Sequence, residues 1–223
     1  MILKYILITS HIGGSVNKSC KTQATTFLEK YYDKQFNGLR TGILPSTDKA
    51  IVHSSLDSVN PVYGEPCGYE VDKLIQELQI DANDVFYDLG SGTGNVCATV
   101  LFGSRCNKAV GIELSDTRHQ TAVKIKEQIQ LDHPNKMENK SLVLINDNFL
   151  NHDYSDATII FTDSVLFTDK TMNEIENRAI KAPNIRYLVS MKSLYTPVHF
   201  KHLKEMNIRA SWGNSRMNIY VPK

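Results

Sequence analysis

An acidic residue that leads into a glycine-rich turn is the part of the sequence best suited to bind a ligand. Asp88 follows a short apolar run and precedes Leu89-Gly90-Ser91-Gly92-Thr93-Gly94-Asn95. Glycines let the backbone turn tightly and approach a ligand without a Cβ atom in between. The dinucleotide fingerprint requires G-x-G-x-x-G, and Asn95 breaks that spacing. The loop therefore favours a ligand without a pyrophosphate, the alternative being an ordinary strand-to-helix turn.

Polar side chains also stand at the ends of the next two apolar runs. Glu113 ends the first of them, where a carboxylate can accept hydrogen bonds from both hydroxyls of a ribose. Asn148 and Phe149 follow the second, where a polar group can meet the edge of an adenine and an aromatic ring its face. Because ligands of open parallel sheets bind at the carboxyl ends of the strands, these segments together predict S-adenosylmethionine as the cofactor.

The elements that must position these residues alternate between strands and helices after Gly68. Helices are predicted at 69–79, 95–102, 115–131 and 169–181, with Ser115 as an N-cap. Strands are predicted at 84–88, 108–113, 142–146, 157–162 and 186–191. This order predicts an α/β fold with a mostly parallel, twisted sheet covered on both faces. Two last runs, 208–212 and 217–221, flank Gly213-Asn214-Ser215 and predict a closing antiparallel hairpin.

The first third of the chain is less regular. Residues 22–36 have the spacing of a helix, and residues 42–68 are rich in Pro, Ser, Asn and Asp, which predicts a long loop of the kind that binds ligands. We therefore divide the chain into an N-terminal extension, 1–60, and a cofactor-binding catalytic domain, 61–223. The apolar start is interrupted by Lys4, so we interpret it as a strand or packed segment rather than as a signal peptide.

Composition narrows the possible partners and sites. The chain has 223 residues, 41% of them hydrophobic, and 25 Lys and Arg against 24 Asp and Glu. This balance gives no general electrostatic reason to bind nucleic acid or anionic lipid, and no apolar run approaches the roughly 20 residues that span a bilayer. The four cysteines form no C-x-x-C pair, which favours reduced thiols in the cytoplasm or another reducing compartment. His199 and His202 are predicted to share a helix face, but no third ligand accompanies them, so no metal site is expected.

Two motifs go beyond the generic pattern. The first is Val62-Tyr63-Gly64-Glu65, and the second, after a predicted helix, is Phe86-Tyr87-Asp88-Leu89-Gly90-Ser91-Gly92-Thr93-Gly94-Asn95. They resemble the V-Y-G-E and F-x-D-L-G-S-G-x-G-[NQ] motifs of the Dot1 family of protein-lysine methyltransferases. Looser similarities follow in Gly111-Ile112-Glu113, Asn148-Phe149-Leu150, residues 188–194, and Ser211-Trp212 with Tyr220. The resemblance covers roughly residue 60 to the end.

The resemblance implies a Rossmann-like class I methyltransferase fold and methyl transfer from S-adenosylmethionine to the ε-amine of a lysine in a protein. It implies acceptor-side roles for Tyr63, Asp163, Ser164, Trp212 and Tyr220. The cofactor-binding residues that the resemblance and the strand ends predict are Glu65, Asp88, Gly90, Ser91, Gly92, Gly94, Asn95, Glu113, Asn148 and Phe149. Trp212 and Tyr220 also fit packing roles, and Asp163 also fits a purely structural role.

Three features depart from the family pattern. The Asn-Asn pair after the fourth strand is Asp163-Ser164 here, and the aromatic residue that usually follows is Val165. The basic segment with which the histone enzymes contact the nucleosome is absent, so charge does not support a histone acceptor. Two alternatives to protein-lysine transfer stay open. One is methylation of another protein side chain or a small molecule, and the other is a non-catalytic module that binds S-adenosylmethionine.

Overall fold

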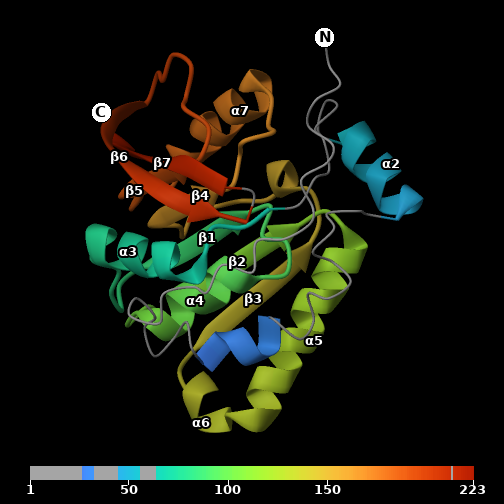
Figure 1. The fold of residues 1–223 in the computed structure, drawn as a ribbon. Coiled ribbons are helices and arrows are strands. Elements are labelled where there is room, and N and C mark those ends of the chain that lie inside the picture. Colours follow the sequence, from blue (N-terminus) through green and yellow to red (C-terminus); the bar gives the residue numbers. More distant parts are fainter. Residues whose placement is uncertain (1–26, 33–44, 56–63, 212) are drawn as a thin grey trace.

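The computed structural model describes residues 27–32, 45–55, 64–211 and 213–223. Seven strands form one sheet in the order β3-β2-β1-β4-β5-β7-β6 (Figure 1). Their bounds are β1 Val85–Leu89, β2 Lys108–Glu113, β3 Ser141–Asn146, β4 Ile159–Thr162, β5 Tyr187–Ser190, β6 Phe200–Ala210 and β7 Gly213–Pro222.

The pairing of the strands confirms the predicted architecture. β1 to β5 are parallel, whereas β7 is antiparallel to β5 and to β6, so the closing hairpin lies at one edge of the sheet. The order of the strands reverses at β1, which pairs with β2 on one side and β4 on the other. In open α/β sheets a ligand binds outside the carboxyl ends of the strands at such a reversal. The fold therefore predicts the ligand crevice outside the ends of β1, β2 and β4.

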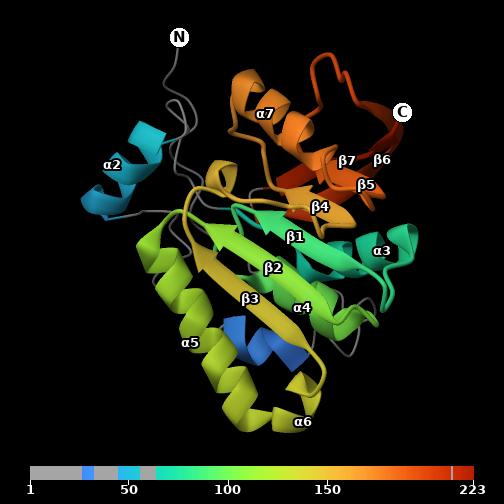
Figure 2. The same ribbon diagram turned by 180° about the vertical axis from the view of Figure 1, so that it is seen from behind.

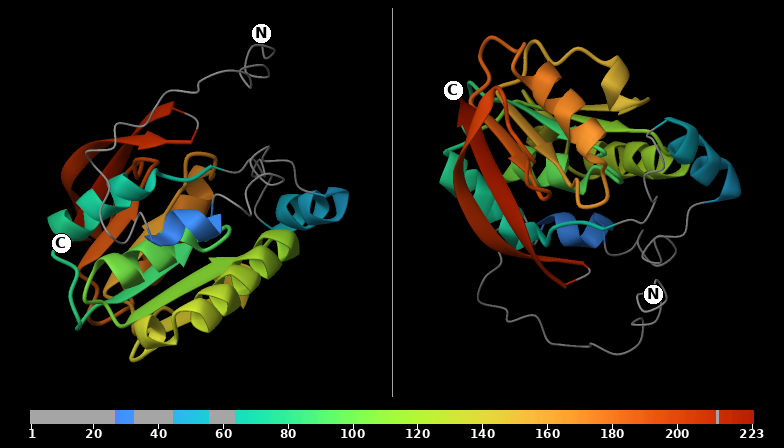
Figure 3. Two further views of the ribbon diagram at one scale, coloured as in Figure 1. Left: turned by 60° about the horizontal axis from the view of Figure 1, so that its bottom comes forward. Right: turned by 90° about the horizontal axis from the view of Figure 1, so that it is seen from above.

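Helices cover the two faces of this sheet. α3 (Gly68–Leu78) and α4 (Asn95–Gly103) share one face, and α7 (Asp169–Ala179) lies on the opposite face, as Figures 1 and 2 show. α5 (Asp116–Asp132) runs beside β3 and leads into the short helix α6 (Pro134–Met137), and η2 (Phe149–Asn151) follows β3. Residues 27–32 are helical and pack on α4 and α5 through Leu28, Tyr31 and Tyr32 (Figure 3, left).

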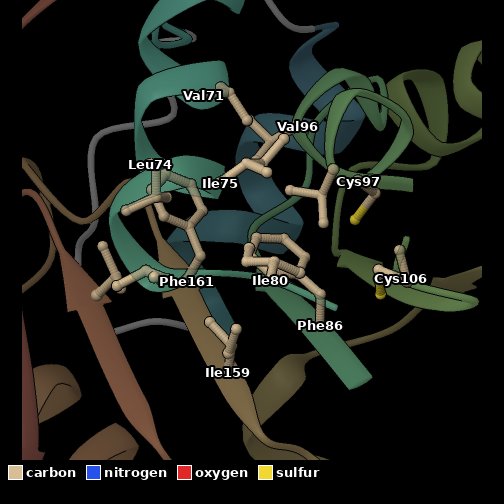
Figure 4. Packing of buried hydrophobic residues seen from close by; sticks show 14 of the residues in the cluster. Val71, Leu74, Ile75, Ile80, Phe86, Val96, Cys97, Cys106, Ile159 and Phe161 are labelled. Carbon is tan, nitrogen blue, oxygen red and sulfur yellow. The ribbon is translucent and has the colours of Figure 1, made fainter. Parts of the chain in front are cut away.

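A hydrophobic cluster under α3 and α4 fixes the central strands. α3 contributes Leu74 and Ile75, and the rings of Phe86 on β1 and Phe161 on β4 stack with centroids 6.3 Å apart (Figure 4). Phe86, Leu74 and Phe161 are each at most 1% exposed. Burying an apolar side chain of this size stabilises a fold by about 1.5–3 kcal/mol. This packing holds the carboxyl ends of β1 and β4 next to each other.

Local predictions are wrong at three places. Gly213, Asn214 and Ser215, which were expected in the turn of the closing hairpin, belong to β7, where Gly213 pairs with Ala210 of β6. Residues 46–55, which were expected to lie in a long loop, form helix α2 (Ser46–Ser55), because Pro45, Ser46 and Asp48 are helix-start residues as well as loop residues. His202 does not share a helix face with His199, because it lies on β6, where it pairs with Tyr220 of β7. Of the predicted helix 22–36, only 27–32 lie within the described residues. No helix in the described part of the chain is long and apolar enough to cross a membrane.

Candidate active site

The glycine loop leaves β1 and folds back over the end of β2. The N–H groups of Gly90 and Ser91 both donate to the carbonyl of Ile112, at 2.9 Å and 3.0 Å. Gly90 and Gly94 have φ values of +88° and +80°, which L side chains rarely adopt, so glycine is required for this path. The loop brings the backbone of Gly90 to Gly94 to the mouth of the crevice.

Glu113, at the end of β2, is buried and held in one orientation by the backbone. Its Oε2 accepts from the Gly92 N–H at 2.8 Å, and its Oε1 accepts from the Ser115 N–H at 2.8 Å. Each carboxylate oxygen keeps a second acceptor site, because a carboxylate offers about four lone-pair positions. This geometry fits a carboxylate that receives the two hydroxyls of a ribose.

A residue that sequence patterns do not identify supports this corner of the site. Asp48 of α2 accepts from the Ser115 hydroxyl at 2.5 Å and from the Thr117 N–H at 3.1 Å, at the start of α5. Against the effect of burial, these hydrogen bonds hold the pKa of Asp48 below its usual value. Ser115 is also the predicted N-cap, since its hydroxyl accepts from the Arg118 N–H. Asp48 thus ties α2 to the strand end that carries Glu113.

Asp88 is the most deeply placed carboxylate of the site. It is 2% exposed, and its Oδ1 has no hydrogen-bond donor among the described residues. Burial raises its pKa well above the usual range, and the neighbouring charges of Asp163, Glu65 and Glu113 raise it further. Buried acceptors without a partner are rare in proteins, which makes this oxygen a candidate contact for a ligand. The ammonium group of an amino acid is a ligand that fits this acceptor.

Glu65 connects the closing hairpin to the glycine loop. The Ser211 N–H donates to the Glu65 carbonyl at 2.9 Å, and the Glu65 N–H donates to the Ser211 hydroxyl at 3.2 Å. The Glu65 carboxylate accepts from the Thr93 hydroxyl at 3.1 Å and from the Asn95 side-chain amide at 3.0 Å. Burial raises the pKa of Glu65 to about 7, against the lowering effects of Asn95, Thr93 and the charge of Arg118.

The segment after β3 presents a polar group and an aromatic ring. Asn148 caps η2, with its side-chain oxygen accepting from the Leu150 N–H at 2.9 Å. The ring of Phe149 is buried and stacks on Phe167, with centroids 5.5 Å apart. A Cβ atom added at Gly90 would lie 3.7 Å from the Phe167 ring, so these aromatics flank the glycine loop. The sequence did not single out Phe167, although it lies two residues after the position where the family's aromatic was expected.

Asp163 and Ser164 follow β4 and differ in what they face. Burial raises the pKa of the partly exposed Asp163 to about 7, and the charge of Glu65 adds to this effect against a backbone hydrogen bond from Val165. Ser164 is fully buried, and its hydroxyl accepts from the Lys192 N–H at 3.1 Å. Asp163 thus keeps part of its surface exposed after the end of β4, whereas Ser164 joins the loops after β4 and β5.

The other acceptor-side residues divide into two groups. Tyr220 is 2% exposed in the cluster beneath α7, and its hydroxyl accepts from the Leu194 N–H at 3.0 Å, which are the contacts of a packing residue. Tyr63 and Trp212 lie outside the described residues, so their acceptor-side roles stay predictions.

Taken together, these residues fit S-adenosylmethionine. Glu113 suits the ribose, and Asn148 and Phe149 suit the adenine. Asp88, with its unpartnered oxygen, suits the cationic methionine end. Glu65 closes that end of the crevice through Thr93 and Asn95. The cofactor would thus lie across the ends of the strands where their order reverses.

Solved structures with this fold include several methyltransferases. Magnesium protoporphyrin IX methyltransferase from Synechocystis PCC 6803, with bound SAM, superposes with a TM-score of 0.55 at 13% identity, over 91% of this chain and 99% of that one. Streptococcus pneumoniae Sp1610, a tRNA (m1A22) methyltransferase by its description, in complex with S-adenosyl-L-methionine, gives 0.53 at 12% identity, over 69% and 72%. At these identities the likeness shows the fold alone.

Similarity in sequence is more specific. A histone-lysine N-methyltransferase, H3 lysine-79 specific, from Caenorhabditis elegans is 33% identical over 127 residues, which are 53% of this chain and 13% of that protein. A protein-lysine N-methyltransferase from Saccharolobus islandicus (strain REY15A) is 28% identical over 90 residues, 40% of this chain and 52% of that protein. The matches thus span about half or less of the length of these relatives. Residues 48–219 match the family model for the histone methylation protein DOT1, and the chain belongs to this family.

Proposed function

We propose that this chain is an S-adenosylmethionine-dependent protein-lysine N-methyltransferase. Membership of the DOT1 family supports this proposal, as do the two lysine methyltransferases among its relatives. The observation that carries the proposal is the position of Asp163. This carboxylate follows β4, beside the cofactor crevice, and its pKa is raised to about 7. Such a group can exchange a proton with an amine near neutral pH.

The cofactor, when bound, supplies a methyl group on a positively charged sulfur. The chain's own residues orient it, since Glu113 fixes the ribose end and Asp88 faces the methionine end. Glu65 holds the segment before α3 against the glycine loop through Thr93 and Asn95, which limits the access of water to that end.

An acceptor lysine must arrive as a neutral amine, about 3 Å from the methyl group and in line with its bond to sulfur. Lysine carries a proton at neutral pH, and an apolar channel together with a nearby cation lowers its pKa. Asp163 first attracts the incoming ammonium group and then accepts its proton, directly or through water. The hydrogen bond from Lys192 to Ser164 holds the strand-end loop that carries Asp163.

The proposed acceptor is a lysine in a protein, and the charge of this sequence does not support a nucleosome-bound histone in particular. Lys and Arg outnumber Asp and Glu by one in this sequence, which gives no basic footprint for nucleosomal DNA. We further propose that the chain works in a reducing compartment, where Cys67, Cys97 and Cys106 stay free thiols.

Incubation with methyl-labelled cofactor and mixed protein acceptors tests the function. We expect label in protein, at a lysine identified by mass spectrometry, and its loss in the Glu113→Ala variant. Label confined to small molecules would replace the proposal with a small-molecule methyltransferase. Cofactor binding without any transfer would replace it with a non-catalytic binding module.

A further inference from the structure

Lys192, in the loop after β5, reaches across to the loop after β4. The two loops leave neighbouring parallel strands at the same edge of the sheet (Figure 2). The Nζ atom of Lys192 donates to the Phe167 carbonyl at 2.7 Å and lies 2.7 Å from Oδ1 of Asp169, the first residue of α7. The backbone N–H of Lys192 also donates to the Ser164 hydroxyl at 3.1 Å. One lysine therefore contacts the loop after β4 and the start of α7 at three points.

Two of these contacts hold the ends of one tight turn. The Phe167 N–H donates to the Ser164 carbonyl at 2.9 Å, which closes a four-residue turn over Ser164 to Phe167. Lys192 binds the first residue of the turn through its backbone and the last through its side chain. The two central residues, Val165 and Leu166, are 43% and 42% exposed. The turn therefore presents two apolar side chains to solvent at the carboxyl end of β4.

Phe167 connects this turn to the cofactor side of the site. Its ring stacks on Phe149 with centroids 5.5 Å apart, and a Cβ atom added at Gly90 would lie 3.7 Å from it. Because Lys192 fixes the carbonyl of Phe167, loss of this contact would let the ring move away from the glycine loop. Asp163 directly precedes the turn. The turn thus stands between the candidate proton acceptor and an aromatic wall of the cofactor crevice.

The stability of α7 does not explain a lysine at this position. A cation at the N-terminus of a helix opposes the helix dipole, whereas an anion such as Asp169 is favoured there. The ion pair of Lys192 with Asp169 is also partly in water, with 30% and 59% of the two side chains exposed, and such pairs contribute little. The bond to the Phe167 carbonyl is charge-assisted, and the backbone of Lys192 is itself anchored, because the Ser190 hydroxyl donates to its carbonyl at 2.7 Å.

We propose that Lys192 is a positioning residue of the methyl-transfer site. It holds the turn Ser164 to Phe167, so that Phe167 stays against the glycine loop and Asp163 stays at the end of β4. Lys192 acts through the turn rather than on the reacting atoms. The kinetic consequences of this inference rest on the proposed function, whereas its effects on the turn and on cofactor binding can be measured without turnover.

Hydrogen exchange and calorimetry test the role of Lys192 without an acceptor. Lys192→Met removes the charge and the donor and keeps a long side chain. In the folded variant we expect the Phe167 N–H, measured by NMR, to exchange roughly tenfold faster or more, because the turn that protects it opens more often. Binding of S-adenosylmethionine should weaken by roughly threefold to tenfold, because Phe167 is no longer held in place for the ligand. Lys181→Met, at an exposed lysine just beyond the end of α7, is the matched control and should change neither.

Steady-state kinetics separate positioning from stability. At saturating cofactor, Lys192→Met should lower kcat by roughly tenfold to a hundredfold, because a small displacement of groups at the site costs that much, and KM for the acceptor should change less. Lys192→Arg should recover much of this loss, since a guanidinium can donate to both the Phe167 carbonyl and Asp169. Asp169→Asn should stay within about twofold of the unaltered protein, because it removes only the exposed ion pair.

Two outcomes would overturn the positioning role. One is a folded Lys192→Met variant that melts at a lower temperature but keeps the cofactor affinity and kcat of the unaltered protein, since the lysine would then only stabilise the fold. The other is an equal loss in Asp169→Asn, which would assign the effect to the ion pair with α7. Lys192→Gln gives the same comparison if Lys192→Met does not fold. Faster exchange and weaker cofactor binding in Lys192→Met, in a chain that labels no protein, would support the hold on the turn and overturn the proposed function.

Discussion

Asn95, the first residue of α4, donates its side-chain amide to the Glu65 carboxylate at 3.0 Å, across 30 positions of sequence. The backbone of Glu65 is in turn paired with Ser211 at the turn of the closing hairpin. Glu65 therefore connects the glycine loop, through its side chain, to the closing hairpin at the edge of the sheet, through its backbone.

Glu113→Ala should weaken S-adenosylmethionine binding by about 2–3 kcal/mol, because buried ribose hydroxyls lose a charged acceptor. The variant also frees the N–H groups of Gly92 and Ser115, so its folding must be checked by circular dichroism. Calorimetric titration measures the affinity. A folded variant with the affinity of the unaltered protein would refute the ribose assignment.

Asp48→Ala should destabilise the start of α5 by about 1–2 kcal/mol, since the Ser115 hydroxyl and the Thr117 N–H lose their acceptor. We also expect weaker cofactor binding, because Ser115 is one of the two groups that orient Glu113. Urea unfolding gives the stability and calorimetry the affinity. Thr47→Ala, on the exposed side of the same turn of α2, is the control, and equal effects of both changes would argue against this support.

The ligand-free protein should lose stability as the pH rises from about 4 to about 8. The folded-state pKa values of Glu65 and Asp163 are raised to about 7, so the folded protein holds protons that the unfolded chain releases near pH 4. The stabilising contribution of these groups is complete below their unfolded pKa and is lost as the pH passes about 7. Thermal unfolding across this pH range measures it.

Saturating S-adenosylmethionine should reverse this trend. A cation beside the two carboxylates lowers their pKa, so the rise in melting temperature caused by the cofactor grows from about pH 6 to about pH 8. A cofactor-induced shift that is constant over this range would show that the two groups do not face the ligand's charge.

Asp163→Asn restores the side chain usual in the family and removes one charge at nearly constant size. If Asp163 receives the proton of the acceptor lysine, kcat/KM should fall by roughly tenfold to a hundredfold at neutral pH, and its pH profile should lose the limb near pH 7. Initial rates at saturating cofactor across about pH 6 to 9 separate this effect from weaker cofactor binding. Wild-type rates throughout that range would favour a purely structural aspartate.

The fold followed from local patterns because its central strands are buried on both faces. The apolar run 108–113 predicted β2 with the bounds that the structure gives. The run predicted at 208–212 covers only the last part of β6. Five consecutive residues of β6, from Lys201 to Glu205, are exposed and show no apolar alternation. Pairing with β7, rather than the composition of the segment, therefore makes it a strand.

The residues of the candidate site also fall into two groups, those that local sequence patterns reveal and those that they do not. Asp88, the glycines and Glu113 could be identified from the sequence because a strand end and a turn constrain them locally. Asp48 and Arg118 could not, because their roles depend on contacts between α2, α5 and the segment before α3, which no local pattern encodes. In the sequence, Tyr220 resembles an acceptor-side residue of the family. In the structure Asn218, not Tyr220, pairs with Ser190 at the end of β5, so Tyr220 lies two residues farther along β7 from that strand end.

The outermost strand, β6, has a further consequence for the behaviour of the protein in concentrated solution. An unpaired strand edge offers its N–H and C=O groups to any other chain, which promotes aggregation. In β6 the register shifts between His202 and Lys204, and the charged residues Lys201, Lys204 and Glu205 lie in its exposed stretch. The irregular backbone and the charged side chains both oppose the addition of a further strand, so this edge is protected against amyloid-like growth.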